Sequence, residues 1–192
     1  MLGSALHLTL VSASPRRREL LSRLGIAADA VMSADIDETP RKNELPRDYA
    51  TRMAREKAVA VAVAGHALAG DTVVAAGRRI LPKADDEATA RACLQLLSGR
   101  RHRVFSAIAL RAPDGVLRER MSETTVQFKR LSAEEIRHYL AGGEWLGKAG
   151  GYAIQGSAEA LVQSLRGSHS GVMGLPLYDT RALLRAAGFD LG

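Results

Sequence analysis

Cysteine and aromatic residues are scarce in this chain of 192 residues. The single cysteine, Cys93, excludes an intrachain disulfide, favours a reducing compartment and suits a small apolar core position. Aromatic residues make up only 4% of the chain, so the core must be built from Leu, Val, Ile and Ala. Because 46% of the residues are apolar, we expect a sizeable core and one domain over residues 1–192.

Long apolar runs are also absent. No run approaches the roughly 18 residues that a membrane-spanning helix requires. Residues 1–10 lack the basic start and the cleavage site that are typical of a signal peptide. These absences predict a cytoplasmic protein that has no membrane partner.

Several signature motifs are missing. The chain has no P-loop, and its five histidines show no zinc-ligand spacing. The chain has 27 basic and 21 acidic residues, which gives a net charge of +6. This charge suits nucleic acid, a polyphosphate substrate or simply a solvated surface. Aromatic residues are not interleaved with the arginines, so we expect no nucleic-acid partner.

Apolar periodicity predicts an α/β fold with a mixed sheet. The composition of residues 35–46 predicts a polar loop, and that of residues 142–156 predicts a glycine-rich loop. The pattern predicts strands over 6–11, 26–34, 67–74, 104–110, 116–128 and 161–166, and helices over 16–24, 47–64, 85–97, 132–140 and 176–187.

Residues 12–18 read Ser-Ala-Ser-Pro-Arg-Arg-Arg and connect the first predicted strand to the first predicted helix. Ser14 suits the N-cap of that helix. A helix start attracts anions, and the Ser12 hydroxyl and the guanidinium groups of Arg16 and Arg17 add donors for phosphate. The segment is therefore either a triphosphate cradle or a capped helix with a basic exposed face.

Carboxylates stand at two informative positions. Asp71 lies near the end of the predicted strand 67–74, where an aspartate is a poor strand former. Two interpretations are open: Asp71 is a functional carboxylate, for catalysis or metal binding, or it is a turn residue. The segment 35–38, which ends at Glu38, is either a site for a divalent cation or a solvated acidic loop.

Two lysines and a glutamine are further candidates. Lys57 lies on the long predicted helix and Lys83 follows a strand, and each could neutralise phosphate charge or lie on the surface. Gln155 lies in the glycine-rich segment 150–156, where its amide could read a base edge or belong to a flexible loop.

Taken together, these segments resemble the Maf family of nucleoside triphosphate pyrophosphatases. The resemblance extends from Leu8 to Ala187, and the ordered set of motifs is more specific than any one of them. The motifs are SASPRR at 12–17, REKA at 55–58, GDTVV at 70–74, LSGRRHRV at 97–104, GEW at 143–145, KAGGYAIQG at 148–156 and GLPLYDT at 174–180.

The resemblance implies an elongated α/β fold similar to that of the inosine triphosphate pyrophosphatase group, with a cleft between two lobes. It implies a homodimer that hydrolyses a nucleoside triphosphate to the monophosphate and pyrophosphate with Mg²⁺ or Mn²⁺. Asp71 is implied as the proton acceptor when water attacks the α-phosphorus, and Glu38 with Asp71 as the metal ligands. The implied substrate-binding residues are Ser12, Arg16, Arg17, Lys57, Thr72, Lys83 and Gln155.

Three positions in the family mark substrate choice. Arg16, Thr72 and Gln155 agree with the branch that resembles dTTP/UTP pyrophosphatases, whereas the 7-methyl-GTP branch has a tryptophan after the Ser-Pro and a glutamine after the aspartate. The run at 37–40 is similar to that second branch. The chain departs from the family at Gly70, where alanine is usual, and at Gly147, where aspartate is frequent.

Other functions remain open on the sequence. The family name refers to an effect on septum formation, so one alternative is a regulator of cell division or a nucleic-acid-binding protein without turnover. A second is a pyrophosphatase that is broad or prefers 7-methyl-GTP. A third is a hydrolase that releases one phosphate at a time.

Overall fold

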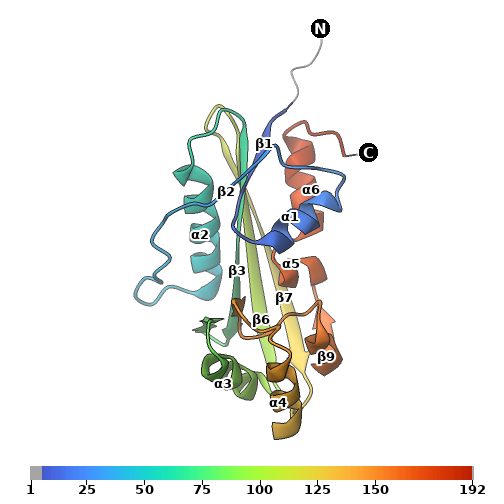
Figure 1. The fold of residues 1–192 in the computed structure, drawn as a ribbon. Coiled ribbons are helices and arrows are strands. Elements are labelled where there is room, and N and C mark those ends of the chain that lie inside the picture. Colours follow the sequence, from blue (N-terminus) through green and yellow to red (C-terminus); the bar gives the residue numbers. More distant parts are fainter. Residues whose placement is uncertain (1–5, 192) are drawn as a thin grey trace.

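Three long antiparallel strands run through the length of the protein (Figure 1). The computed structural model describes residues 6–191. Shorter strands complete a seven-stranded mixed sheet in the order β2-β1-β3-β6-β7-β9, with β4 beside the end of β3. The strands are β1 (Leu8–Val11), β2 (Ala30–Met32), β3 (His66–Ala76), β4 (Arg79–Leu81), β6 (Arg101–Arg111), β7 (Leu117–Phe128) and β9 (Val162–Arg166).

Helices cover both faces of this sheet. In Figure 1, α2 (Pro46–Ala60) lies on one side of the long strands, and α1 (Pro15–Ser22), α5 (His169–Met173) and α6 (Leu177–Ala186) lie on the other. Helices α3 (Glu87–Leu97) and α4 (Ala133–Ala141) lie at the far end. A two-stranded sheet pairs β5 (Lys83–Ala84) with β8 (Lys148–Ala149), and the 3-10 helix η1 spans Ser157–Leu161. The predicted α/β class with a mixed sheet is confirmed.

Strand β3 separates two apolar cores because its side chains alternate between the two faces. Ala69 and Val73 pack with the buried face of α2, whereas Leu68 and Val74 join the leucine-rich core on the other face. Cys93 belongs to that second core, as predicted. Asp71, between Ala69 and Val73, therefore faces α2.

One stretch of the β3 edge has no neighbouring strand in the described part of the chain. Strand β1 pairs with β3 only as far as Ala69, and β4 begins to pair at Val74. Residues 70–73 between these points form an open edge. Since β1 is parallel to β3 and leads directly into α1, this edge lies beyond the carboxyl end of β1, where open α/β sheets bind ligands.

Several local predictions need correction. Asp71 is not near the end of its strand but in the middle of β3, which continues to Ala76. The strand predicted over 26–34 is limited to β2. Ser14 occupies the N-cap of α1 but makes no side-chain cap hydrogen bond. Its N–H instead donates to Ser12 Oγ at 3.1 Å, so the serine pair shapes the turn before the helix.

Five short elements were not among the helices and strands expected from the sequence: β4, β5, β8, η1 and α5. Strand β8 lies inside the glycine-rich loop predicted over 142–156. Helix α5 has only five residues, which are too few to show a helical repeat of apolar residues. Within residues 6–191, no helix is long and apolar enough to cross a membrane. The absence of a signal peptide was predicted from residues 1–10. Residues 1–5 of that segment lie outside the described residues.

Candidate active site

A cavity of about 640 Å³ surrounds the open edge of β3. Its walls come from the β1–α1 turn, the middle of β3, the segment 146–155 and the turn after α5. Every site residue predicted from the sequence lines this cavity: Ser12, Arg16, Arg17, Glu38, Lys57, Asp71, Thr72, Lys83 and Gln155.

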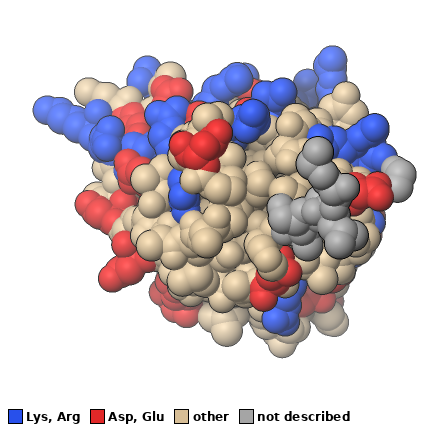
Figure 2. Space-filling model, turned by 90° about the horizontal axis from the view of Figure 1, so that it is seen from above, with Lys and Arg blue, Asp and Glu red and all other residues tan. Residues whose placement is uncertain are grey.

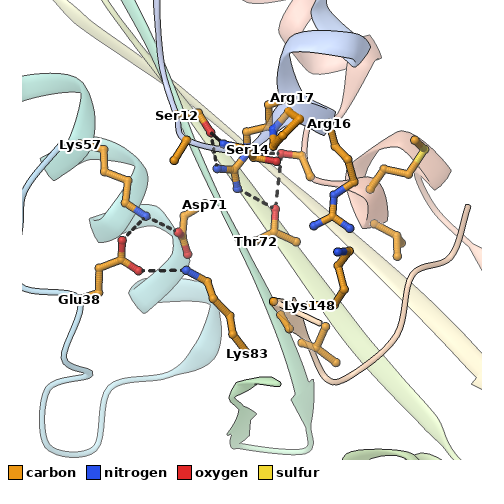
Figure 3. Close-up of a pocket in the computed structure, with 18 of the residues that line it drawn as sticks. Ser12, Ser14, Arg16, Arg17, Glu38, Lys57, Asp71, Thr72, Lys83 and Lys148 are labelled. Atoms are coloured by element: carbon orange, nitrogen blue, oxygen red, sulfur yellow. Dashed lines mark hydrogen bonds and ion pairs between the residues drawn. The ribbon is translucent and has the colours of Figure 1, made fainter. Parts of the chain in front are cut away.

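A carboxylate–lysine network occupies the side of the cavity that faces α2 (Figure 3). Lys57 Nζ lies 2.7 Å from Asp71 Oδ1 and 2.9 Å from Glu38 Oε1. Lys83 Nζ lies 3.4 Å from the second oxygen of Glu38. The side chains of Lys57 and Asp71 are only 11% and 9% exposed, whereas Glu38 and Lys83 are at the cavity mouth. We call these four residues the carboxylate–lysine network.

Opposing effects act on Glu38. Partial burial raises the pKa of its carboxyl group, but the hydrogen bonds and charges of Lys57 and Lys83 outweigh burial and leave that pKa below its ordinary value. The loop that carries Glu38 is held by Tyr49, whose hydroxyl donates to the Glu38 carbonyl oxygen at 2.7 Å. Burial first, and then the charges of Asp71 and Glu38, raise the pKa of Tyr49 to about 12, so the phenol stays protonated.

Tyr49 is a site residue that the sequence-based prediction missed. The sequence feature that could have identified Tyr49 is the helical spacing that places Tyr49, Met53 and Lys57 on one face of α2. That face is buried against β3. The same spacing that builds the core therefore brings the Lys57 ammonium group to the cavity and the phenol to an adjoining pocket, which Glu38 and Asp71 also line.

Arg17 organises the opposite side of the open edge. Its guanidinium group donates to the Gly174 carbonyl oxygen at 2.8 Å, to Ser12 Oγ at 3.1 Å and to Thr72 Oγ1 at 3.4 Å. Burial lowers the pKa of Arg17, while the charges of Asp71 and Glu38 oppose that effect. Arg17 thus joins α1, β3 and the turn after α5 into one wall.

Two further cations stand beside Arg17 in Figure 3. Burial, and then the charge of Arg17, lower the pKa of Arg16. Burial, and then the charge of Arg16, lower the pKa of Lys148. Lys148 was not among the predicted site residues, although it lies in the quoted motif at 148–156. Arg16, Arg17 and Lys148 form what we call the cationic cluster, and an anionic ligand would relieve their mutual repulsion.

Gln155 lies on a turn that Glu144 holds in place. Glu144 Oε2 accepts hydrogen bonds from the Ser157 N–H at 2.8 Å and from the Ser157 hydroxyl at 3.1 Å. Gly156 packs directly on this carboxylate, because a Cβ there would lie 2.1 Å from Glu144 Oε2. The Gln155 side chain is exposed at the cavity wall. Gln155 therefore lines the cavity from a turn whose following residues, Gly156 and Ser157, contact Glu144.

The protein groups available to a metal ion are few. The described residues contain no group of three or more His, Cys, Asp or Glu side chains suited to a metal ion. Glu38 and Asp71 nevertheless contact the same cation, Lys57 Nζ. Two hard oxygen ligands together with substrate oxygens and water match the way proteins bind Mg²⁺.

The two departures from the family pattern have different surroundings. A Cβ at Gly70 would lie 3.3 Å from the Ala107 carbonyl oxygen and 3.5 Å from Arg17 Nε, so the backbone and Arg17 approach closely there. Gly147 lines the cavity with φ +66° and has open space where a side chain would stand. A carboxylate at that position would thus reach the cavity, at the cost of a left-handed backbone.

The face of the molecule seen in Figure 2 is not uniformly basic. Seen from above in Figure 2, Lys and Arg side chains are interspersed with Asp and Glu, and a broad area between them carries neither. The cationic cluster, by contrast, converges on the cavity. This arrangement favours a small anionic ligand over a long polyanion.

Comparisons with known proteins agree with the geometry. A model of the Maf-like protein family matches residues 7–187. The dTTP/UTP pyrophosphatase of Novosphingobium aromaticivorans is 67% identical over 96% of this chain and 94% of its own length. The dTTP/UTP pyrophosphatase of Rhodospirillum rubrum is 61% identical over 96% of this chain and 90% of its own length.

A solved structure shares the fold at much lower identity. A HAM1 protein from Coxiella burnetii superposes with a TM-score of 0.53 at 17% identity, over 94% of this chain and 99% of that chain. This likeness concerns the fold alone. The family model over residues 7–187 and the relatives at 67% and 61% identity show that the chain belongs to the Maf family.

Proposed function

We propose that this chain is a nucleoside triphosphate pyrophosphatase that hydrolyses dTTP and UTP to the monophosphate and pyrophosphate. The observation that carries the proposal is the meeting of the carboxylate–lysine network and the cationic cluster at one open strand edge. The first supplies a buried carboxylate for chemistry, and the second supplies charge for a triphosphate. The names of the Novosphingobium and Rhodospirillum relatives support dTTP and UTP as substrates.

The proposed reaction is attack of water on the α-phosphorus. A bond forms between the water oxygen and that phosphorus, and the bond to the bridging oxygen breaks, so that pyrophosphate leaves. Asp71 accepts the proton of the attacking water. Lys57, at 2.7 Å, fixes the orientation of the Asp71 carboxylate. Lys83, Arg16, Arg17 and Ser12 stabilise the charge of the triphosphate in the transition state.

A divalent ion, Mg²⁺ or Mn²⁺, fits this site. Glu38 and Asp71 would hold it, because contacts of 2.9 and 2.7 Å to the same Lys57 Nζ bring the two carboxylates close to each other. The lowered pKa of Glu38 keeps its carboxylate charged near neutral pH. A bound ion neutralises phosphate oxygens and polarises the reacting group.

The other sequence-based expectations extend the proposal. We propose a cytoplasmic homodimer with one Maf-like domain over residues 1–192. A regulator that only binds nucleic acid has no use for a buried carboxylate–lysine pair inside a cavity. A preference for 7-methyl-GTP does not suit the combination of Arg16, Thr72 and Gln155.

The test is product identification with a panel of nucleoside triphosphates and Mg²⁺ or Mn²⁺. We expect monophosphate and pyrophosphate, formed fastest from dTTP and UTP. Asp71→Asn should lower kcat by about 10²–10⁴-fold with a nearly unchanged Tm. The control Asp48→Asn changes an exposed aspartate of α2 and should keep wild-type turnover. Unaltered turnover of Asp71→Asn, or hydrolysis of no nucleotide, would refute the proposal.

A further inference from the structure

A path of hydrogen bonds links Thr72 to helix α5 behind the cavity. Thr72 and Ser106 stand opposite each other in the pairing of β3 with β6, and their hydroxyl oxygens are 2.9 Å apart. Ser106 Oγ also contacts the carbonyl oxygen of Gly171 in α5. Ser106 is only 1% exposed. The path therefore begins in the protein interior and ends at the cavity wall.

The Gly171 carbonyl oxygen, at the buried end of this path, determines which hydroxyl donates in each hydrogen bond. A carbonyl oxygen can only accept, so Ser106 donates its hydroxyl hydrogen to Gly171. Ser106 has no second hydrogen, so its oxygen accepts the hydrogen of Thr72. Leaving a buried hydroxyl or carbonyl unpaired is costly, and this cost keeps both bonds in the same direction.

Thr72 consequently faces the cavity as a hydrogen-bond acceptor. Its remaining polar neighbours agree with this polarity. The Gly174 carbonyl oxygen, at 3.5 Å, could only accept the Thr72 hydrogen, and Arg17 Nη2, at 3.4 Å, can only donate to the Thr72 oxygen. None of these neighbours turns the hydrogen of Thr72 toward a ligand.

We propose that Ser106 sets this polarity and thereby makes the cavity select a base that carries an imide N–H. Uracil and thymine present that N–H at N3, between two carbonyl oxygens, whereas N3 of cytosine is an acceptor. A fixed Thr72 acceptor pairs with the imide and faces an unfavourable acceptor in cytosine. The amide NH₂ group of Gln155, in the same cavity, supplies a donor for one of the flanking carbonyl oxygens.

Ser106 is thus a positioning residue that acts through Thr72. The inference rests on the proposed function and names the feature of the substrate that the site reads. It also separates two effects that a loss of activity alone would confuse. A merely structural role for Ser106 would lower turnover of every nucleotide equally, whereas a role in polarity changes the preference between UTP and CTP.

The first experiment compares kcat/KM for UTP and CTP. The wild type should prefer UTP by about 100-fold, and Ser106→Ala should reduce that preference by about tenfold or more. The substitution frees the Thr72 hydrogen to turn toward N3 of cytosine. The matched control Thr124→Val removes another buried hydroxyl, which donates to the Ser168 carbonyl oxygen and accepts from the Ser168 N–H before α5. Thr124→Val should keep the wild-type preference.

A second experiment needs no substitution and therefore holds even where Ser106→Ala does not fold. N3-methyluridine triphosphate lacks the imide hydrogen, and the wild type should hydrolyse it about 100-fold more slowly than UTP. The control 5-methyluridine triphosphate carries its methyl group away from the imide and should be hydrolysed like UTP.

The outcomes separate the two proposals. Folded Ser106→Ala with an unchanged UTP-to-CTP preference would overturn the inference, as would equal wild-type turnover of UTP and CTP, or of UTP and its N3-methyl analogue. Each of these results leaves the pyrophosphatase activity intact. Hydrolysis of no nucleotide by the wild type would instead refute the proposed function itself.

Discussion

Asp71 and Thr72 are adjacent on strand β3, yet their side chains contact partners on opposite faces of the sheet. Asp71 pairs with Lys57 of α2, and Thr72 contacts Ser106 and Arg17 on the other face. The open edge at residues 70–73 lets one cavity reach both. The strand therefore separates the carboxylate–lysine network from Thr72 and the cationic cluster, while one cavity contacts both.

Replacing Lys57 by methionine should damage both stability and turnover. The ammonium group lies between Glu38 and Asp71, so its removal leaves two carboxylates without their shared partner. We expect the free energy of unfolding at pH 7 to fall by on the order of 3 kcal/mol, measured by chemical denaturation, and kcat for UTP to fall by about 100-fold or more.

The pH dependence distinguishes this cause from simple loss of packing. The hydrogen bond and charge of Lys57 help to hold the pKa of Glu38 below its ordinary value, so this stabilisation is lost when Glu38 is protonated. The loss of stability in Lys57→Met should therefore shrink as the pH falls from 7 into the acid range. Lys42→Met, at an exposed position, should match the wild type throughout. If the loss in free energy of unfolding of Lys57→Met relative to the wild type does not change with pH, the electrostatic explanation is contradicted.

Introducing the carboxylate that the family often has should strengthen metal binding. Gly147→Asp places a third carboxylate at the cavity wall, where Gly147 has open space. Its left-handed backbone should cost about 1 kcal/mol of stability. We expect the Mn²⁺ concentration for half-maximal activity to fall several-fold. Gly147→Asn carries the same backbone strain without the charge, and equal metal dependence of the two variants would contradict the prediction.

Removing the Glu144 carboxylate should loosen the turn that presents Gln155. Glu144 accepts two hydrogen bonds from Ser157, and hydrogen bonds to a charged group are among the stronger ones in proteins. Glu144→Ala should raise KM for UTP by about tenfold, with a smaller change in kcat. Steady-state kinetics of Glu159→Ala, an exposed substitution in η1, provide the control. Parallel losses in both variants would argue against a specific role for Glu144.

Burial of His102 should make the protein less stable in mild acid. Burial lowers the pKa of His102 to about 4, whereas histidine in an unfolded chain has a pKa of about 6.5. Between these values the unfolded chain binds a proton that the folded chain excludes, so the free energy of unfolding falls as pH falls.

The variant His102→Gln removes this titration and keeps a polar partner for the Tyr152 hydroxyl, which lies 2.8 Å from His102 Nε2. The loss of stability from pH 7 to pH 5 should be smaller in the variant by about 2 kcal/mol. Denaturation curves of the exposed substitution His138→Gln should show the wild-type pH dependence. An unchanged slope in His102→Gln would show that His102 does not titrate in this way.

The sequence predicted the elements that carry regular patterns. The helices predicted over 47–64 and 85–97 correspond to α2 and α3. The capping box of Ser132 and Glu135 is present at the start of α4. The motif resemblance led to a set of residues that all line one cavity, while their individual roles stay proposals.

Local patterns were insufficient where distant segments decide the structure. Residues 67–76 are apolar on both faces apart from Asp71 and Thr72, so no change in periodicity marks where β3 ends. Lys148 enters the cavity because β8 pairs with β5, a contact that the glycine-rich segment does not reveal. Helix α5 is too short to show a 3.6-residue period, and therefore the partner of Ser106 could not be found from the sequence.

Hydrolysis of UTP in ¹⁸O-labelled water tests the central claim most directly. Mass spectrometry of the products locates the bond that water makes. Attack on the α-phosphorus, as proposed with Asp71 as proton acceptor, places the label in UMP and leaves pyrophosphate unlabelled. Label in pyrophosphate, or release of orthophosphate with UDP, would contradict the account.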